Sequence, residues 1–135
     1  MAVRISRSLL DWILAEAAAM PAREVCGLLL GTKGEIIDVR PAHNISKRAG
    51  DRFEIDPQLL FDQARAERAG GTPRIGHYHS HPNGRAEPSR TDAQAAALEP
   101  AQLWMIVAGG EATLWRADSQ GGLHGRFERV DLAVG

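Results

Sequence analysis

Three histidines alternate with other residues in the short stretch GHYHSHP, and this pattern constrains the fold more than any other feature of the sequence. In a β-strand, side chains two residues apart point to the same face, so His77, His79 and His81 would share one face of a sheet. Pro82 follows them and favours an extended backbone at His81. Three alternating imidazoles before a proline indicate a metal site rather than ordinary strand packing.

A further ligand is predicted just downstream of the histidine strand. Residues 89–98 have the pattern of a helix, and Ser89 and Asp92 have the spacing of a capping box at its start. Asp92 would then lie in the first helical turn, close to the end of the strand. Two histidines, one carboxylate and an open fourth position form a catalytic zinc set. We therefore favour His79, His81 and Asp92 as ligands, with His77 beside them or facing a substrate.

The same pattern also permits a three-histidine site. His77 and His81 are separated by about 13 Å along a strand that rises roughly 3.3 Å per residue, whereas zinc–nitrogen bonds are only ~2.0–2.1 Å long. Both would reach one ion only if the strand bent sharply. Taken alone, Asp92 would be an ordinary helix-start carboxylate and Ser89 an ordinary N-cap.

Helices and strands alternate along the rest of the chain. An apolar stripe predicts a helix at residues 6–19, and Pro57 and Gly70 bound a second helix at 57–70. Strands are predicted at residues 25–31, 35–40, 74–82, 102–109, 111–117 and 123–132, and the first two form a hairpin. Residues 41–56 form a long polar loop. This mixture predicts one layered α/β (α+β) domain over residues 1–135.

Composition and charge limit the possible partners and the location. The chain has 16 Lys and Arg against 17 Asp and Glu, which argues against nucleic-acid binding. Asp11 and Glu16 interrupt the apolar N-terminal stretch, so neither a secretory signal nor a membrane span is predicted. Because Cys26 is the single cysteine, no intrachain disulfide forms, which fits a reducing compartment. We expect a cytoplasmic protein without a membrane partner.

The pair of motifs HSHP and SRTD resembles the signature of the JAMM (MPN+) zinc metalloprotease family, in which H-x-H-P precedes S-x-x-D. The segment EVCGLLLG, residues 24–31, is similar to the family's upstream strand, which begins with a glutamate. The order of elements matches the family over roughly residues 5–115. The resemblance implies a single JAMM/MPN domain of minimal prokaryotic type. Such a domain has a mixed central β-sheet flanked by helices, as in cytidine deaminase.

The resemblance also implies a role for each site residue. His79, His81 and Asp92 would hold Zn²⁺, with water in the fourth place. Glu24 would be the general base that takes a proton from the water and delivers it to the leaving amine. Ser89 would hydrogen-bond to the tetrahedral oxyanion or help to position the water. The residues themselves do not distinguish Glu24 from other acidic side chains, so its role comes from the resemblance alone.

The family resemblance implies a class of substrate as well. Similar members hydrolyse peptide or isopeptide bonds at the C-terminal Gly-Gly tail of ubiquitin-like proteins. Because this chain is compact, its substrate would be a ubiquitin-like sulfur-carrier protein or the C-terminal adduct of one. Such a tail binds as an extended strand, with the 41–56 loop as one wall of the groove. Asn44, in that loop, and His77, which replaces a bulky aromatic residue of the family, are candidate substrate contacts.

Three other functions are compatible with parts of the sequence. One is a zinc hydrolase of small peptides or amides that needs no protein partner. A second is a non-catalytic MPN scaffold module, although scaffold members usually lack the ligand set found here. The third is a thiol peptidase built on Cys26, which shares strand parity with Glu24; we expect Cys26 instead to be a small buried strand residue. Cytidine deamination would need a P-C-x-x-C ligand pair that the sequence lacks.

Overall fold

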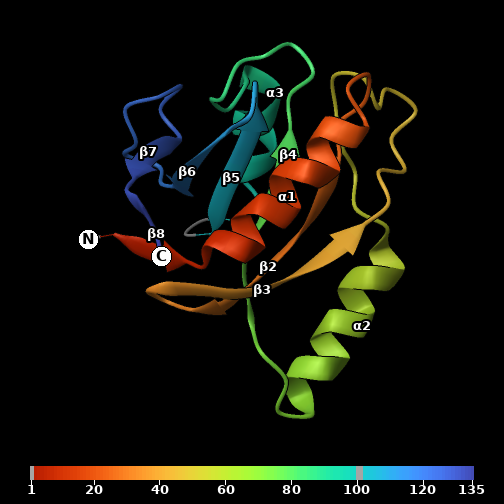
Figure 1. Cartoon of the computed structure of the whole chain (residues 1–135), viewed down its shortest axis with the longest axis vertical. Coiled ribbons are helices and arrows are strands. Elements are labelled where there is room, and N and C mark those ends of the chain that lie inside the picture. Colours follow the sequence, from red (N-terminus) through yellow and green to blue (C-terminus); the bar gives the residue numbers. More distant parts are fainter. Residues whose placement is uncertain (1, 100–101) are drawn as a thin grey trace.

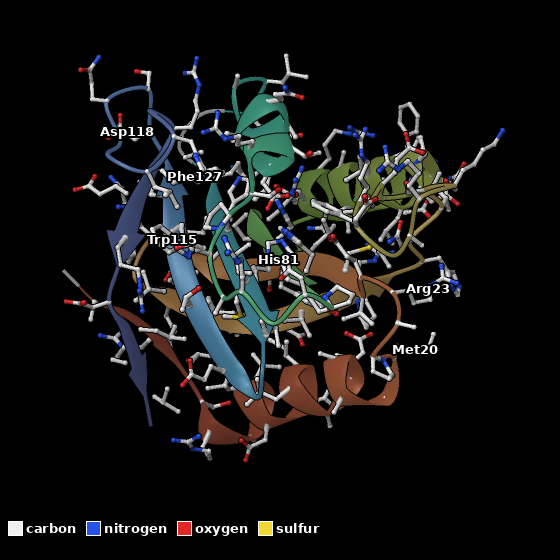
Figure 2. All side chains as sticks on the ribbon, turned by 90° about the horizontal axis from the view of Figure 1, so that it is seen from above. Met20, Arg23, His81, Trp115, Asp118 and Phe127 are labelled. Carbon is white, nitrogen blue, oxygen red and sulfur yellow. The ribbon has the colours of Figure 1, made fainter. Side chains whose placement is uncertain are left out.

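A mixed β-sheet runs through the molecule, with helices on both of its faces (Figures 1 and 2). The structure is a computed structural model that describes residues 2–99 and 102–135. In chain order the elements are β1 (Val3–Ile5), α1 (Arg7–Ala19), β2 (Cys26–Thr32), β3 (Glu35–Ala42), α2 (Pro57–Arg68), β4 (Arg74–Ser80), α3 (Arg90–Ala96), β5 (Leu103–Ala108), β6 (Glu111–Ala117), β7 (Phe127–Val130) and β8 (Leu132–Val134).

The histidine strand β4 lies in the interior of this sheet. The strand order is β7-β6-β5-β4-β2-β3-β1-β8. β4 pairs in antiparallel fashion with β2 and in parallel with β5, so that His79 lies between Cys26 on one side and Ile106 on the other. Hydrogen bonds on both edges fix the backbone of β4, and the side chains that alternate along it therefore have defined directions.

The two faces of β4 serve different purposes. Tyr78 points to the face covered by α1, where its hydroxyl donates a hydrogen bond to Glu16 at 2.7 Å. The Tyr78 ring occupies the space where a Cβ atom at position 27 would lie, so Gly27 on β2 has no room for a side chain. The histidines point to the other face, which carries α2 and α3 (Figure 2). The larger apolar cluster thus lies under α1, and the histidines lie on the opposite face.

Two apolar clusters hold these layers together. The cluster on the α1 side consists of Val3, Ile5, Leu10, Ile13, Leu29, Ile36, Tyr78, Leu103, Met105, Val107, Leu114 and Val130. The cluster on the α3 side consists of Ala93, Ala96, Trp104, Ile106, Trp115, Ala117 and Phe127. The second cluster anchors α3 against β5, β6 and β7, and so fixes the helix that carries Asp92.

The predicted fold class is confirmed, including the hairpin of β2 and β3 and all three helices. The prediction of one strand at residues 123–132 is wrong, because this region contains β7 and β8 with a break at Asp131. β1 was not predicted. β1 and β8 have three residues each, too few for a periodic pattern, and they pair in parallel near the two ends of the chain (Figure 1). No helix in the described part of the chain is long and apolar enough to cross a membrane.

Candidate metal centre and active site

Three donor groups converge at the end of β4. The Nε2 atoms of His79 and His81 lie 3.1 Å apart. One carboxylate of α3, that of Asp92, lies 3.2 Å from the first nitrogen and 3.1 Å from the second. All three side chains are buried. The structure therefore brings together the three residues that the sequence predicts as metal ligands.

The start of α3 fixes the direction of the Asp92 carboxylate. Ser89 is the N-cap, and its Oγ accepts the Asp92 backbone N–H at 3.0 Å. In return, Oδ2 of Asp92 accepts the Ser89 backbone N–H at 2.8 Å. This reciprocal capping box satisfies two N–H groups of the first helical turn and holds the carboxylate against the histidines. Burial raises the pKa of Asp92, but His79, His81 and the Ser89 N–H lower it by more, so that this pKa lies below its usual value.

The donor set fits a zinc ion in type and spacing. Tetrahedral zinc with bonds of ~2.0–2.1 Å places neighbouring ligand atoms about 3.3–3.4 Å apart. The observed separations of 3.1–3.3 Å are close to these values. Nδ1–H of His81 donates to the backbone carbonyl of Arg85 at 2.9 Å. In the neutral ring, Nε2 then carries the free lone pair, which points toward His79 and Asp92 and could bind a metal ion.

Glu24 lies beside the two histidines. A carboxylate oxygen of Glu24 and ring nitrogens of His79 and His81 all lie within 4.8 Å of one another. Glu24 is 4% exposed, and its Oε1 has no hydrogen-bond partner in the described protein. Burial raises the pKa of Glu24 to about 7, with a smaller lowering by His81 and a smaller raising by Asp92. A carboxylate with such a pKa accepts and releases protons near neutral pH.

His77 lies outside this group of donors. Its ring packs edge-on against Trp104, with 4.2 Å between ring centroids, and lies 5.1 Å from Phe53. Burial lowers the pKa of His77 well below its usual value, so the ring is neutral. The converging atoms belong to His79, His81 and Asp92, an arrangement that disfavours the three-histidine alternative.

Asn44, predicted as a substrate contact, is surrounded by backbone groups. Its Nδ2 group donates to the backbone carbonyls of Glu24 at 3.0 Å and Arg52 at 2.8 Å. Its Oδ1 accepts the backbone N–H groups of Ser46 at 3.0 Å and Glu54 at 3.1 Å. A side-chain amide has two N–H donors and two acceptor lone pairs, so all are in use. The Asn44 side chain therefore has no free hydrogen-bonding group to offer a substrate.

Cys26 lies on the interior strand β2 and is completely buried. Burial raises the pKa of the Cys26 thiol to about 12, and Glu16 and Glu24 raise it further by smaller amounts. Only a thiolate is an effective nucleophile, so this environment opposes a thiol peptidase. The expected role of Cys26 as a small buried strand residue agrees with its position.

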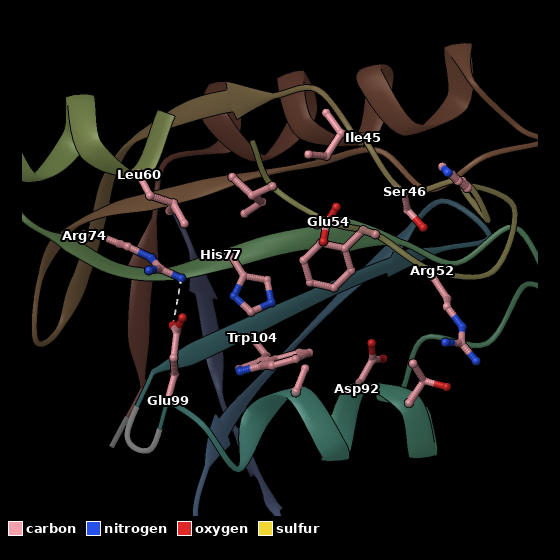
Figure 3. A pocket seen from close by; sticks show the side chains of 15 residues that line it. Ile45, Ser46, Arg52, Glu54, Leu60, Arg74, His77, Asp92, Glu99 and Trp104 are labelled. Atoms are coloured by element: carbon pink, nitrogen blue, oxygen red, sulfur yellow. Dashed lines mark hydrogen bonds and ion pairs between the residues drawn. The ribbon is translucent and has the colours of Figure 1, made fainter. Parts of the chain in front are cut away.

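A pocket of about 620 Å³ opens beside Asp92 (Figure 3). β4 and β5 supply its floor through His77 and Trp104, and α3 supplies one wall. The loop between β3 and α2 forms the opposite wall. Figure 3 shows Asp92 toward one end of the pocket and the ion pair of Arg74 and Glu99, 3.0 Å long, toward the other. The pocket is large enough for several residues of an extended peptide.

Two contributors to the site were not identified from the sequence. The ring of Phe53 stacks on His79 with 4.3 Å between centroids, although Phe53 lies in the irregular loop. Ser80 lies between His79 and His81, and its Oγ accepts the backbone N–H of Val25 at 2.9 Å. Neither contact has a local sequence signal, because each joins segments that are distant in the chain.

Comparisons with known proteins agree with this arrangement. Residues 6–118 match the family described as prokaryotic homologs of the JAB domain. A desampylase of Haloferax volcanii is 31% identical over 103 residues, which cover 75% of this chain and 73% of that protein. The tail tip assembly protein K of Escherichia phage N15 is 35% identical over 116 residues, covering 84% of this chain and 44% of that protein.

Solved structures show the same fold at lower identity. A protein of Desulfitobacterium hafniense, solved in solution, has a TM-score of 0.81 and covers 98% of this chain and 92% of its own at 21% identity. A JAB1/MPN domain protein from Archaeoglobus fulgidus has a TM-score of 0.65 at 21% identity, with 99% and 98% coverage. A third structure, described as a JAMM metalloprotease-like zinc site in the proteasome and signalosome, has a TM-score of 0.60 at 21% identity, with 100% and 99% coverage.

Proposed function

The chain belongs to the prokaryotic JAB-domain family, and on that premise we propose that it is a zinc-dependent peptidase or isopeptidase. This family agrees with the resemblance of the sequence to JAMM/MPN proteins. The convergence of His79, His81 and Asp92 next to the unpartnered carboxylate of Glu24 is the observation that carries the proposal. A site for Lewis-acid hydrolysis needs three such ligands, an open position and a nearby proton acceptor.

His79, His81 and Asp92 would hold the zinc ion. When bound, zinc supplies Lewis acidity, which lowers the pKa of a coordinated water to about 7 and polarises a carbonyl group. Glu24 takes the proton of the attacking water on its carboxylate and then delivers it to the nitrogen of the leaving amine. Its pKa of about 7 suits both transfers.

Ser89 and the capping box complete the catalytic arrangement. The Oγ of Ser89 accepts the Asp92 N–H, and this leaves its O–H proton free to donate. In the proposed reaction that proton is donated to the oxyanion that develops on the scissile carbonyl. Ser89 also keeps Asp92 in place through its backbone N–H. One residue would thus support the ligand and stabilise the transition state.

The proposed substrate is the C-terminal Gly-Gly tail of a ubiquitin-like protein, and more specifically of a sulfur-carrier protein or its C-terminal adduct. The similarity to the Haloferax desampylase supports this class of substrate. The pocket beside Asp92 would receive the extended tail, with the 45–55 segment and α3 as its walls. Glycines at the scissile bond fit a narrow approach to buried ligands, because they bring no side chain.

Cleavage of a carrier fusion tests the proposal. Zinc-loaded protein is expected to hydrolyse a ubiquitin-like sulfur carrier extended beyond Gly-Gly by one amino acid, and to lose this activity with a chelator. The Glu24→Gln variant is expected to bind zinc and remain inactive. No cleavage of any Gly-Gly-X carrier by the zinc-loaded protein would exclude the proposed substrate.

A second candidate function is hydrolysis of small peptides or amides without a protein partner. The pocket extends from Asp92 to the ion pair of Arg74 and Glu99 (Figure 3), and its volume of about 620 Å³ also accommodates a short peptide. Turnover of short peptides at a rate equal to that of the carrier fusion would support this second function over the first.

A further inference from the structure

Glu24 is the proposed general base, yet no hydrogen bond among the described residues fixes the direction of its carboxylate. The residue lies in the irregular segment between α1 and β2, and its Oε1 has no partner in the described protein. The direction of a side chain without polar contacts is set by its backbone and its packing alone. Whatever holds the Glu24 backbone therefore holds the base against the metal ligands.

The loop between β3 and α2 grips the Glu24 backbone at both of its polar groups. The Glu24 N–H donates to the carbonyl of Ala49 at 2.6 Å. The Glu24 carbonyl accepts Nδ2 of Asn44 at 3.0 Å. A third contact links Arg23 to the same loop, because its Nη2 donates to the backbone carbonyl of Asn44 at 2.9 Å. Glu24 itself is thus bonded to the loop, whereas the next residue, Val25, is bonded to Ser80 of β4.

Asn44 also organises the loop itself. Through Arg52, Ser46 and Glu54 its amide closes a short hairpin-like segment, which is reinforced by the bridge between Asn44 and Ile55. This segment carries Phe53, which stacks on His79, and it lines one wall of the pocket. One buried amide therefore connects the wall of the pocket, a metal ligand and the base.

We infer that Asn44 is a positioning residue for the reaction, and that its amide sets the place of the Glu24 carboxylate by joining the Glu24 backbone to the pocket wall. This inference rests on the proposed function for the identity of the reaction, but the link itself belongs to the fold. Only an amide supplies both halves of the contact: two N–H donors for Glu24 and Arg52, and an acceptor for Ser46 and Glu54.

The Asn44→Asp variant separates the two halves. Aspartate keeps the acceptor bonds to the N–H groups of Ser46 and Glu54, but loses the donor bonds to the carbonyls of Glu24 and Arg52 and places a negative charge beside both. The zinc content is expected to be unchanged. For carrier cleavage, kcat is expected to fall by roughly tenfold to a hundredfold while KM changes by less than about twofold, because the base is displaced and the pocket wall keeps its bonds from Ser46 and Glu54.

Amide hydrogen exchange by NMR gives a readout that needs no activity. In Asn44→Asp, the N–H groups of Glu24 and Val25 keep their own partners but are expected to exchange about fivefold faster, because local opening of this segment no longer breaks the bond from Asn44 to the Glu24 carbonyl. The N–H groups of Tyr78 and Met105 in the sheet interior report the loss of global stability caused by the buried charge, and exchange at Glu24 and Val25 is expected to rise by more than at these two residues. Asn83→Asp is the matched control, since it adds the same charge at the other asparagine of the chain and is exposed.

The outcomes separate the inference from the proposed function. Faster exchange at Glu24 and Val25 in Asn44→Asp alone supports the link, and a selective fall in kcat establishes its part in the reaction. Unchanged exchange at both residues overturns the inference. A rise in KM with unchanged kcat also overturns it, because Asn44 would then contact the substrate. If the wild-type protein cleaves no carrier while the exchange result holds, the proposed function fails and the link stands.

Discussion

Ser80 makes hydrogen bonds to both backbone polar groups of Val25. Its Oγ accepts the Val25 N–H at 2.9 Å, and its backbone N–H donates to the Val25 carbonyl at 3.0 Å. Ser80 lies between His79 and His81, and Val25 directly follows Glu24, the proposed base. The small residue between the histidines therefore couples the strand that carries the ligands to the segment that carries Glu24.

Ser80→Ala is predicted to weaken this coupling without removing a ligand. The Val25 N–H would lose its partner in a part-buried position, so the free energy of unfolding is expected to fall by about 1–3 kcal/mol. The zinc content is expected to stay near that of wild type and kcat to fall. Thermal unfolding, metal analysis and carrier cleavage check these three expectations. Loss of zinc in Ser80→Ala would mean that Ser80 acts on the histidines and not on Glu24.

Metal content distinguishes the two possible ligand sets. Wild type and His77→Ala are predicted to bind about one zinc ion per chain, whereas Asp92→Ala is predicted to lose most of it, because a tetrahedral site with two protein ligands is weak. Mass spectrometry of the three proteins, purified in parallel, makes the comparison. Zinc lost with His77 and retained without Asp92 would instead establish a three-histidine site and require a different mechanism.

The pH dependence of stability is predicted to report the burial of Glu24. Its pKa in the folded metal-free protein is raised from 4.5 to about 7. The folded state therefore binds a proton more tightly than the unfolded state, and the stability due to this group is lost as the pH rises from about 4.5 to 7. The shift corresponds to up to about 3 kcal/mol at ~1.4 kcal/mol per pKa unit.

Glu24→Gln isolates this contribution, because glutamine does not titrate. Denaturant unfolding of both metal-free proteins between about pH 4 and 8 measures the difference in their free energies of unfolding. This range includes both the ordinary and the raised pKa of Glu24. Wild type is expected to lose stability relative to Glu24→Gln as the pH rises. Parallel curves for the two proteins would show that Glu24 titrates normally and is less buried than the structure indicates.

Local patterns predicted much of the site, and tertiary contacts supplied the rest. Alternation along β4 placed His79 and His81 on one face, and the capping-box spacing placed Asp92 in the first turn of α3. Both signals depend on the chain's own periodicity. The loop between β3 and α2 has no period, so neither the stacking of Phe53 on His79 nor the saturation of the Asn44 amide could be predicted.

The strands β1 and β8 likewise could not be predicted from local sequence patterns. Each is three residues long, and they are strands because they pair with each other and, in the case of β1, with β3. Glu24 is the corresponding case in the site: a single acidic residue before a strand has no local pattern that distinguishes it from other acidic residues. Only a resemblance between whole proteins selected Glu24, and only the folded chain shows how its backbone is held.

The pocket beside Asp92 provides the last prediction. Ala95 lies on the exposed side of α3 and lines the pocket, while its neighbour Gln94 is exposed and does not line it. Ala95→Phe adds a ring to the pocket without touching a ligand, so KM for the carrier fusion is expected to rise by about tenfold or more while zinc content is unchanged. Gln94→Phe adds the same ring to the same helix and is expected to leave KM within about twofold of wild type. Equal KM values for both variants and wild type would place the tail elsewhere on the surface. An equal rise in both would show that the added ring disturbs α3 itself.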